Sequence, residues 1–200
     1  GPALDNRTEE PINGIAYTPG NTYNFTINAT DITNAVNNVT LIFDNITYVA
    51  TKDGLRYNAT ITDLPAGTHN YSWIANDTLG NINTTPTFQF LVNKATSVMN
   101  LTLNGTQGNL TINEGGIINI TANLTNGTGT IELFINGTLL DLGISPLSNI
   151  TTLAGPGSYN ITARYNATQN FSGTTTTNFI TVNDTTPPAA VTNLAVSGSK

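Results

Sequence analysis

The sequence predicts an all-β fold made of two tandem antiparallel β-sandwiches with about seven strands each. Three observations lead to this prediction: β-branched residues dominate the composition, apolar and polar residues alternate with a period of two, and one pattern recurs later in the chain. Ile, Val and Thr together number 64 of the 200 residues, whereas helix formers such as Glu, Lys and Met are scarce. The amino-acid composition therefore favours strands over helices.

Alternation is clearest in residues 23–30, where Tyr23, Phe25, Ile27 and Ala29 are separated by Asn and Thr. Successive side chains of a strand point to opposite faces, so this pattern is typical of a half-buried strand. Comparable patterns predict further strands in segments distributed along the chain, namely 38–43, 116–125, 159–165 and 178–183. We find no helical period longer than one turn.

An internal repeat indicates two modules. Residues 67–76 align with 157–166 at an offset of 90, and residues 90–93 align with 180–183 at the same offset. Turn dipeptides such as Asn-Gly and Asp-Gly separate the short strands of each copy. We therefore predict one module over 5–93, a second over 94–183, and a linker or the truncated start of a further module over 184–200. The junctions are short, which favours a semi-rigid arrangement.

The alignment leaves one register open in the middle of each copy. Residues 38–43 match 129–134 at an offset of either 91 or 92. A shift of one residue moves every side chain of a strand to the other face, so the two choices predict opposite inward faces. Both alternatives stand at the level of sequence.

The chain resembles an excised piece of a longer protein. Gly1-Pro2 is typical of the remnant left when a fusion tag is cleaved, and the last residues stop in the middle of a pattern. We therefore expect any signal or anchor of the native protein to lie outside this sequence.

Composition excludes several classes of function. Lys and Arg number six against twelve acidic residues, for a net charge of −6, so nothing here can neutralise a nucleic acid or an anionic membrane surface. No apolar run approaches the ~20 residues of a membrane span, so we expect no direct membrane insertion. Cysteine is absent, which excludes disulfide and zinc-thiolate chemistry.

Several segments resemble repeats of microbial surface proteins. Residues 129–138, 157–165 and 170–174 are similar to the strand and closing patterns of bacterial and archaeal Ig-like repeats, and 64–81 is similar to Ig-like repeats of archaeal cell-surface proteins. Residues 184–196 resemble the opening strand of a fibronectin type III module. The resemblance implies Ig-like sandwiches in a tandem array on a cell surface, and it implies no catalytic residues.

On this basis we predict a non-catalytic stalk or spacer of a large extracellular, cell-surface glycoprotein of the adhesin or S-layer type, archaeal by resemblance. Neighbouring Ig-like modules of the same chain are the expected partners, with a cell-surface glycan or protein as a further partner. Two alternatives remain open: an adhesion module that binds a glycan or protein on another cell, and an accessory domain of a secreted enzyme. We expect no cofactor and no metal.

Asn-x-Ser/Thr triplets provide a signal that is independent of the resemblance. The chain contains 21 such triplets, none with proline in the middle, where its composition predicts about seven. One explanation is geometric, because residues i and i+2 share a strand face and an outward face of Asn and Thr creates the triplet automatically. The other is N-glycosylation of an exported protein. The predicted acceptors are Asn24, Asn28, Asn38, Asn45, Asn58, Asn70, Asn76, Asn100, Asn109, Asn119, Asn123, Asn136, Asn149, Asn160, Asn166 and Asn170.

Two aromatic positions are better explained by structure than by chemistry. His69, the only histidine, has no acidic or histidine neighbour in sequence, and the repeat places it opposite Tyr159. We predict that both lie in the turn before the penultimate strand, near the tyrosine corner of Ig-like folds. Trp73, opposite Ala163 in the repeat, is predicted to lie in the core.

Ion binding and covalent cross-linking are the remaining candidate chemistries. Asp77 in the loop 76–81 and Asp184 at a junction carry the oxygen ligands that calcium uses, but their spacing matches no ion-binding loop, so we predict solvated turn residues. Lys94, Glu132 and Asn178 occur in the order of an intramolecular Lys–Asn cross-link. Alternation points Glu132 outward, however, whereas that reaction needs a buried carboxyl.

Overall fold

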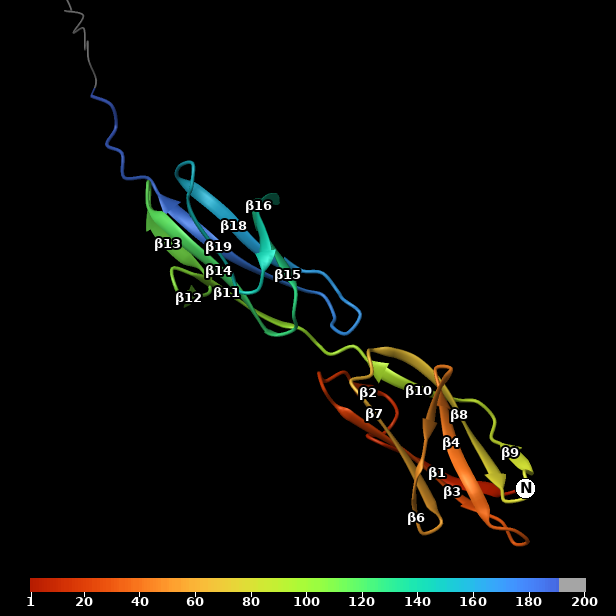
Figure 1. Ribbon diagram of the computed structural model, residues 1–200. Helices are drawn as coiled ribbons and strands as arrows, with labels where there is room; N and C mark the ends of the chain where they lie inside the picture. The colour runs from red at the N-terminus through yellow and green to blue at the C-terminus, as the bar shows by residue number, and fades with distance from the viewer. Residues whose placement is uncertain (191–200) are drawn as a thin grey trace, which may run out of the picture. The chain divides into compact units, whose positions relative to one another are not determined.

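The computed structural model describes residues 1–190, and these form strands, turns and loops without a helix. The chain divides into two compact units (Figure 1). The first unit contains Gly1–Val98 and the segment Asn166–Thr174, and the second contains Met99–Tyr165 and the residues from Thr175 onward. The all-β fold predicted from the alternation is confirmed, whereas the module boundaries 5–93 and 94–183 stay a prediction.

The first unit is a sandwich of two sheets. One sheet is antiparallel throughout, in the order β1 (Ala3–Glu10), β3 (Thr22–Thr30), β7 (Arg56–Thr62) and β6 (Thr51–Asp53). The other runs β2 (Ile15–Ala16), β10 (Phe88–Asn93), β8 (Gly67–Asp77), β4 (Val36–Phe43) and β5 (Ile46–Val49), and β9 (Ile82–Thr84) also pairs with β8. The chain leaves the first sheet after β1 and joins the second through β2, which pairs parallel with β10.

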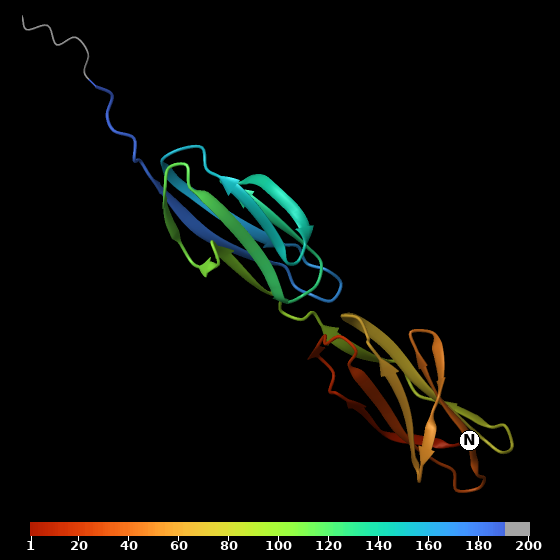
Figure 2. The ribbon, with the colours of Figure 1, turned by 60° about the vertical axis from the view of Figure 1, so that its left-hand side comes forward.

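The second unit repeats the order of the sheet that contains the last strand, whereas its other sheet has an extra short strand beside the first long one and no counterpart of β6. One sheet has the order β12 (Thr106–Gln107), β11 (Val98–Leu103), β14 (Ile117–Asn126) and β17 (Leu147–Thr152). The other has the order β13 (Leu110–Asn113), β19 (Thr174–Asn183), β18 (Gly157–Tyr165), β15 (Thr130–Ile135) and β16 (Thr138–Ile144). A short strand, β13, again pairs parallel with the last strand, as β2 does with β10. The two sheets of each unit face one another (Figure 2).

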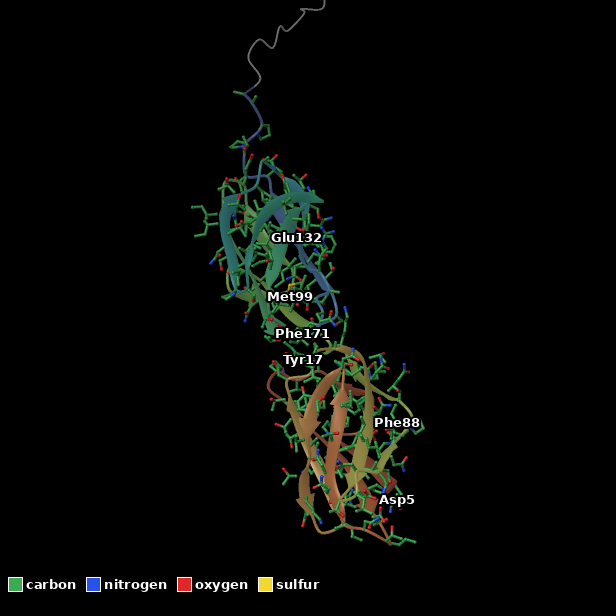
Figure 3. All side chains as sticks on the ribbon, turned by 45° about the vertical axis from the view of Figure 1, so that its right-hand side comes forward. Asp5, Tyr17, Phe88, Met99, Glu132 and Phe171 are labelled. Atoms are coloured by element: carbon green, nitrogen blue, oxygen red, sulfur yellow. The ribbon has the colours of Figure 1, made fainter. Side chains whose placement is uncertain are left out.

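Alternation along the strands separates core from surface. In β3 the side chains of Tyr23, Phe25, Ile27 and Ala29 are buried. On the other face Asn24, Asn28 and Thr30 are partly exposed, and Thr26 is buried. The strands expected around 116–125 and 159–165 show the same pattern. Figure 3 shows side chains filling the space between the two sheets of each unit. Burial of these apolar faces is the main stabilising contribution that such a sequence offers.

Strand pairing settles the register that the sequence left open. Leu41 of β4 lies opposite Trp73 of β8, and Leu133 of β15 lies opposite Ala163 of β18. Leu41 and Leu133 are therefore equivalent, at an offset of 92, while the later strands keep the offset of 90. The difference is an even number of residues, so it preserves which side chains face the core. Trp73 and Ala163 are both fully buried, as the repeat predicts.

The predicted start of a third module spans 184–200. Within the described residues it contains no strand, since 184–190 follow β19 without regular structure. Residues 191–200 lie outside the described part of the chain, so the expected opening strand stays a prediction.

Candidate functional site

The predicted acceptor asparagines occupy outward sheet faces, turns and loops, with the exception of Asn149 on β17. Exposed among them are Asn38, Asn45, Asn70, Asn109, Asn119, Asn123, Asn136 and Asn166. Partly exposed are Asn24, Asn28, Asn58, Asn76, Asn100, Asn149, Asn160 and Asn170. None of the sixteen belongs to the buried class. The prediction that these residues carry glycans remains a prediction.

The acceptors differ in whether the amide nitrogen is available. Asn149 pairs with the buried Ile120, so it shares a face with the core. Its Nδ2 donates a hydrogen bond to Asp141 Oδ2 at 2.9 Å. Because a glycan is attached through that nitrogen, Asn149 is poorly placed as an acceptor. Asn119 and Asn123 on β14 are exposed instead, on the outward face of the same sheet.

Three tight turns use the side chain of their first residue to join a third strand. Asn136 Oδ1 accepts a hydrogen bond from Asn160 N at 2.9 Å, and Asn136 N donates to Asn160 O at 3.0 Å. Asp44 forms the corresponding pair of bonds with Asn70, and Asn104 with Asn119. The sequence identifies the Asn136-Gly137 turn from its dipeptide, but not this bond to a third strand. Only the fold brings the two segments together.

Both ring nitrogens of His69 make hydrogen bonds within the first unit. His69 is the third residue of β8 rather than part of the preceding turn, which corrects the predicted position, and it is buried. His69 Nε2 lies 2.9 Å from the carbonyl oxygen of Pro65, four residues upstream. In the second unit the Tyr159 hydroxyl donates in the same way to the carbonyl of Gly155, also four residues upstream, at 2.9 Å. Tyr159 is likewise the third residue of its strand, β18, so the predicted position is wrong for both residues. Each makes a hydrogen bond to an upstream carbonyl of the kind found in a tyrosine corner, but from within the strand.

The fold also supplies an acidic partner for His69 that sequence reasoning missed. Asp44 Oδ2 lies 2.6 Å from His69 Nδ1, although 25 residues separate them. The contact is an ion pair when both ring nitrogens carry protons. Asp44 Oδ1 is already bonded to Asn70 N. His69 therefore ties a turn and two strands together and has no free nitrogen for catalysis or metal binding.

The loop proposed for calcium is held together by its own donors. Asp77 is 1% exposed, and its Oδ1 accepts hydrogen bonds from the backbone N–H of Leu79 and Asn81, both at 2.9 Å. Its Oδ2 accepts from Asn81 Nδ2 at 2.6 Å. The side-chain bond from Asn81 is the main cause that lowers the pKa of Asp77. Asp77 is thus a buried capping residue, which corrects the prediction of a solvated one.

The other candidate ion ligand also has a local partner. Asp184 Oδ1 accepts a hydrogen bond from Thr186 N at 2.9 Å. Among residues 1–190, no group of three or more His, Cys, Asp or Glu side chains is arranged to hold a metal ion.

The three residues considered for a cross-link have separate partners. Lys94 Nζ donates to the Thr168 carbonyl at 2.6 Å. Glu132 forms an ion pair with Arg164 at 2.6 Å and is partly exposed, as alternation predicts. Asn178 is buried and donates through Nδ2 to the Leu101 carbonyl at 3.0 Å. This arrangement contains no buried acid beside a Lys–Asn pair.

One surface hollow of about 500 Å³ is lined by Thr47, Tyr48, Val49, Thr51, Asn58, Ala59 and Thr60. Its lining includes hydroxyl groups of threonine and tyrosine but no acid, histidine or lysine that could activate them. No helix long and apolar enough to cross a membrane occurs in the described part of the chain.

Comparison with known families agrees with this architecture. Residues 8–72 match a family described as a bacterial Ig domain. No curated protein matches the chain. The strand order of both units and the match in the first one define the class of protein: tandem β-sandwich modules of the Ig-like or fibronectin III-like type.

Solved structures with similar folds come from several microbial proteins. Fibronectin(III)-like modules of Clostridium thermocellum CbhA share 16% identity, with a TM-score of 0.38 and coverage of 92% of this chain and 95% of that chain. A putative membrane anchored protein from Corynebacterium diphtheriae shares 15%, with a TM-score of 0.40 and coverage of 92% and 55%. A 1.5-MDa bacterial ice-binding adhesin shares 17%, with a TM-score of 0.35 and coverage of 91% and 65%.

Proposed function

We propose that this chain is a non-catalytic spacer within the stalk of a large extracellular, cell-surface glycoprotein of an archaeon or bacterium. The observation that carries the proposal is the combination of two repeated sandwiches with outward faces built largely from Asn and Thr. Such faces are hydrated and nearly uncharged, and they present no cluster of groups for catalysis. The match to a bacterial Ig domain over residues 8–72 supports a modular, extracellular role.

The polar side chains considered for chemistry support the same proposal. His69, Asp77, Glu132 and Asn178, which could have served chemistry, each take part in contacts that join strands or close turns. Titratable groups with shifted pKa values gather at the functional sites of enzymes, but they also occur in structural hydrogen-bond networks. Here the perturbed carboxyl of Asp77 is surrounded by N–H donors from its own loop. A structural role accounts for every one of these contacts.

A replacement experiment in the native full-length protein tests the spacer role. Residues 5–183 would be exchanged for an unrelated pair of β-sandwiches of equal length. A spacer depends on length and rigidity, so we expect surface display and any adhesion or enzymatic activity to be kept. Deletion without replacement should impair activities that depend on reach. Loss of binding to another cell in the exchanged protein would instead identify an adhesion module. If the native protein carries an enzyme domain, a loss of its activity in the exchanged protein, which has the same length, would identify an accessory domain.

Glycosylation is the second part of the proposal. Acceptor triplets on exposed turns and outward faces, such as those at Asn119 and Asn123, are open to an enzyme that adds a glycan. Protein purified from the native host would be digested and analysed by mass spectrometry. We expect glycopeptides at exposed positions including Asn119 and Asn123, and an unmodified Asn149, whose amide nitrogen is bonded to Asp141. Unmodified peptides throughout would leave strand geometry as the sole cause of the triplets.

A further inference from the structure

The surface hollow of about 500 Å³ in the first unit contains one of the predicted acceptor asparagines. Its lining comes from β5, β6 and β7, and Asn58 on β7 belongs to it. β5 and β6 are edge strands of the two sheets, so the hollow lies on the flank of the sandwich. The volume is within the range of ligand-binding pockets. Because the lining carries no charged side chain, a matching occupant is neutral.

The amide nitrogen of Asn58 is available for attachment of a glycan. Asn58 Oδ1 is buried and has no hydrogen-bond partner, whereas Nδ2 is neither buried nor bonded within the described residues. This orientation is the opposite of that of Asn149, whose Nδ2 donates to Asp141. Asn58 and Thr60 form an Asn-x-Thr triplet on one face of β7. The acceptor nitrogen is therefore free beside the hollow.

The ring of Tyr48 provides a flat apolar surface in the same hollow. Tyr48 lies opposite the buried Leu41 in the pairing of β5 with β4, so its ring is on the inner side of its sheet. Because β5 is an edge strand, the ring is left partly exposed and lines the hollow. The electron-rich face of an aromatic ring attracts C–H groups, which cover one side of many sugar rings.

Two threonines complement the hydroxyl groups of a sugar. Thr51 on β6 pairs with Asn58, and the Cβ atoms of such a pair lie about 5 Å apart. Thr47 on β5 also lines the hollow, and both threonines are exposed. A threonine hydroxyl can donate one hydrogen bond and accept two. Hydroxyls that both donate and accept, as those of sugars do, match this lining.

Two other hollows contain acceptors but lack an accessible ring. Asn45 and Asn70 line a hollow of about 200 Å³ whose single ring, that of Tyr71, is 1% exposed. Asn100 lines a hollow of about 270 Å³ that contains no aromatic residue. Among these four acceptors, Asn58 is the one that lies beside an accessible ring.

We propose that the first sugars of a glycan on Asn58 occupy this hollow and stack on Tyr48, so that the glycan becomes a structural part of the first unit. This inference rests on the proposed glycosylation of the chain. Attachment forms a bond between Asn58 Nδ2 and the anomeric carbon of a neutral sugar. It breaks the bond from that carbon to the diphosphate of an activated glycosyl donor, and one amide proton passes to a base of the transferase.

Covalent attachment allows weak contacts to hold the sugar. A free sugar must offset the translational and rotational freedom that it loses on binding. A sugar joined to Asn58 is already near Tyr48, so its effective concentration at the ring is high. The contacts form only when β5, β6 and β7 are in place, so they stabilise the folded state relative to the unfolded one.

Thermal unfolding of chains with and without glycans tests the proposal. Wild type, Asn58→Gln and Asn70→Gln would be made in the native host and in a host that lacks N-glycosylation. Among glycosylated proteins, Asn58→Gln should lower the midpoint of the Trp73 fluorescence transition by about 4 °C or more. The unglycosylated pair measures the effect of the side-chain change alone, which should be smaller. Asn70→Gln is the matched control and should not change the midpoint.

Hydroxyl-radical footprinting measures the contact with the ring directly. Oxidation of Tyr48 should be several times slower in glycosylated wild type than in the unglycosylated chain, because the sugar covers the ring. This protection should be absent in glycosylated Asn58→Gln and kept in glycosylated Asn70→Gln. In a Tyr48→Thr background the glycan stays attached but has no ring to cover, so Asn58→Gln should no longer lower the midpoint.

Mass spectrometry of the same samples separates failure of this inference from failure of the proposed glycosylation. Glycopeptides at other triplets with an unmodified Asn58 would overturn the inference and leave the proposed glycosylation in place. A glycan on Asn58 that neither protects Tyr48 nor raises the midpoint would also overturn the inference, because such a glycan extends into solvent. Unmodified peptides throughout would overturn both.

Discussion

At the scale of single residues, Asp and Asn residues with positive φ angles connect turns to neighbouring strands. Asp44, Asn104 and Asn136 have φ angles of 46°, 51° and 48°, in the region that tight hairpin turns require. Asn and Asp tolerate this region better than other side chains do. Each also accepts a backbone hydrogen bond from a third strand. At each of these positions one residue thus supplies both the backbone conformation of the turn and a hydrogen-bond acceptor for the sheet.

Substitutions of Asp44 should separate the two roles. In Asp44→Asn, Oδ1 still accepts from Asn70 N, as Asn136 does from Asn160, and the new amide can donate to a neutral His69 ring protonated on Nε2. We expect a loss below about 1 kcal/mol in the free energy of unfolding. Asp44→Ala removes the acceptor and places alanine at positive φ, so we expect a loss of about 2 kcal/mol.

Urea unfolding at pH 7 measures both variants of Asp44. Trp73 is the only tryptophan and lies in the core of the first unit, so its fluorescence reports on this unit directly. Equal losses for the two variants would show that the charge contact with His69, and not the turn geometry, dominates.

At the scale of elements, the two units use different contacts at the same place in the fold. Phe88 on β10 and Asn178 on β19 are 90 positions apart and both lie in the last strand of a unit. Phe88, labelled in Figure 3, packs against the guanidinium of Arg7 on β1, with Cζ 3.9 Å from the ring centroid. Asn178 instead donates to the Leu101 carbonyl on β11. Both contacts join the first and last strands, which belong to opposite sheets.

Truncation of Asn178 should therefore destabilise the second unit. Asn178→Ala leaves the Leu101 carbonyl without its donor, and we expect a loss of about 1–3 kcal/mol. Circular dichroism should record the loss, while the midpoint of Trp73 fluorescence in the first unit stays unchanged. Thr181→Ala, at an exposed position of the same strand, is the control and should change stability by less than about 0.5 kcal/mol. A shifted fluorescence midpoint would show that the two units unfold together.

At the scale of the whole molecule, three carboxylates link stability to acid pH. Hydrogen bonds from Thr33, Asn81 and Asn149 are the main causes that lower the pKa values of Asp31, Asp77 and Asp141, respectively. A depressed pKa in the folded state means that the stabilisation is complete above the unfolded value of about 3.9 and is lost as pH falls through the folded value. The midpoint of thermal unfolding should therefore fall as the pH drops below about 4.

Asp77→Asn tests the contribution of one carboxylate to this acid limb. Its amide would direct N–H groups at Asn81 Nδ2, a donor, so the variant should be less stable than wild type near neutral pH. The difference between the two proteins should shrink as pH falls, because protonation removes the wild-type advantage. A difference that is constant down to pH 2 would contradict the linkage.

Metal dependence is also a property of the whole chain. Because the Asp77 oxygens already accept hydrogen bonds from Leu79 and Asn81, a cation would have to displace them. We expect identical thermal melts in millimolar calcium and in excess EDTA. A bound cation at a hundredfold excess over its Kd would add about 2.7 kcal/mol and raise the midpoint by some 10 °C. A shift of that size would assign calcium a structural role.

Local patterns in the sequence determined the strands, the turns and the buried side chains. The period-two alternation around Tyr23 and Phe25 depends only on how a strand orients its own residues, and the recurrence of a pattern at an offset of 90 requires no knowledge of contacts. Turns such as the one at Asn136-Gly137 can likewise be predicted from their dipeptides alone. These features are predictable because each one is specified within a few residues.

Only the tertiary structure decided which distant groups meet. It selected the offset of 92 for β4 and β15, brought Asp44 to His69, and buried Asp77 within its loop. It also distinguished Asn149, whose amide is bonded, from Asn119 and Asn123, although all three share one triplet pattern. Which strand lies at the edge of a sheet, as β16 does, likewise follows from pairing among strands far apart in sequence. Such contacts depend on how the whole chain packs, and no local pattern encodes them.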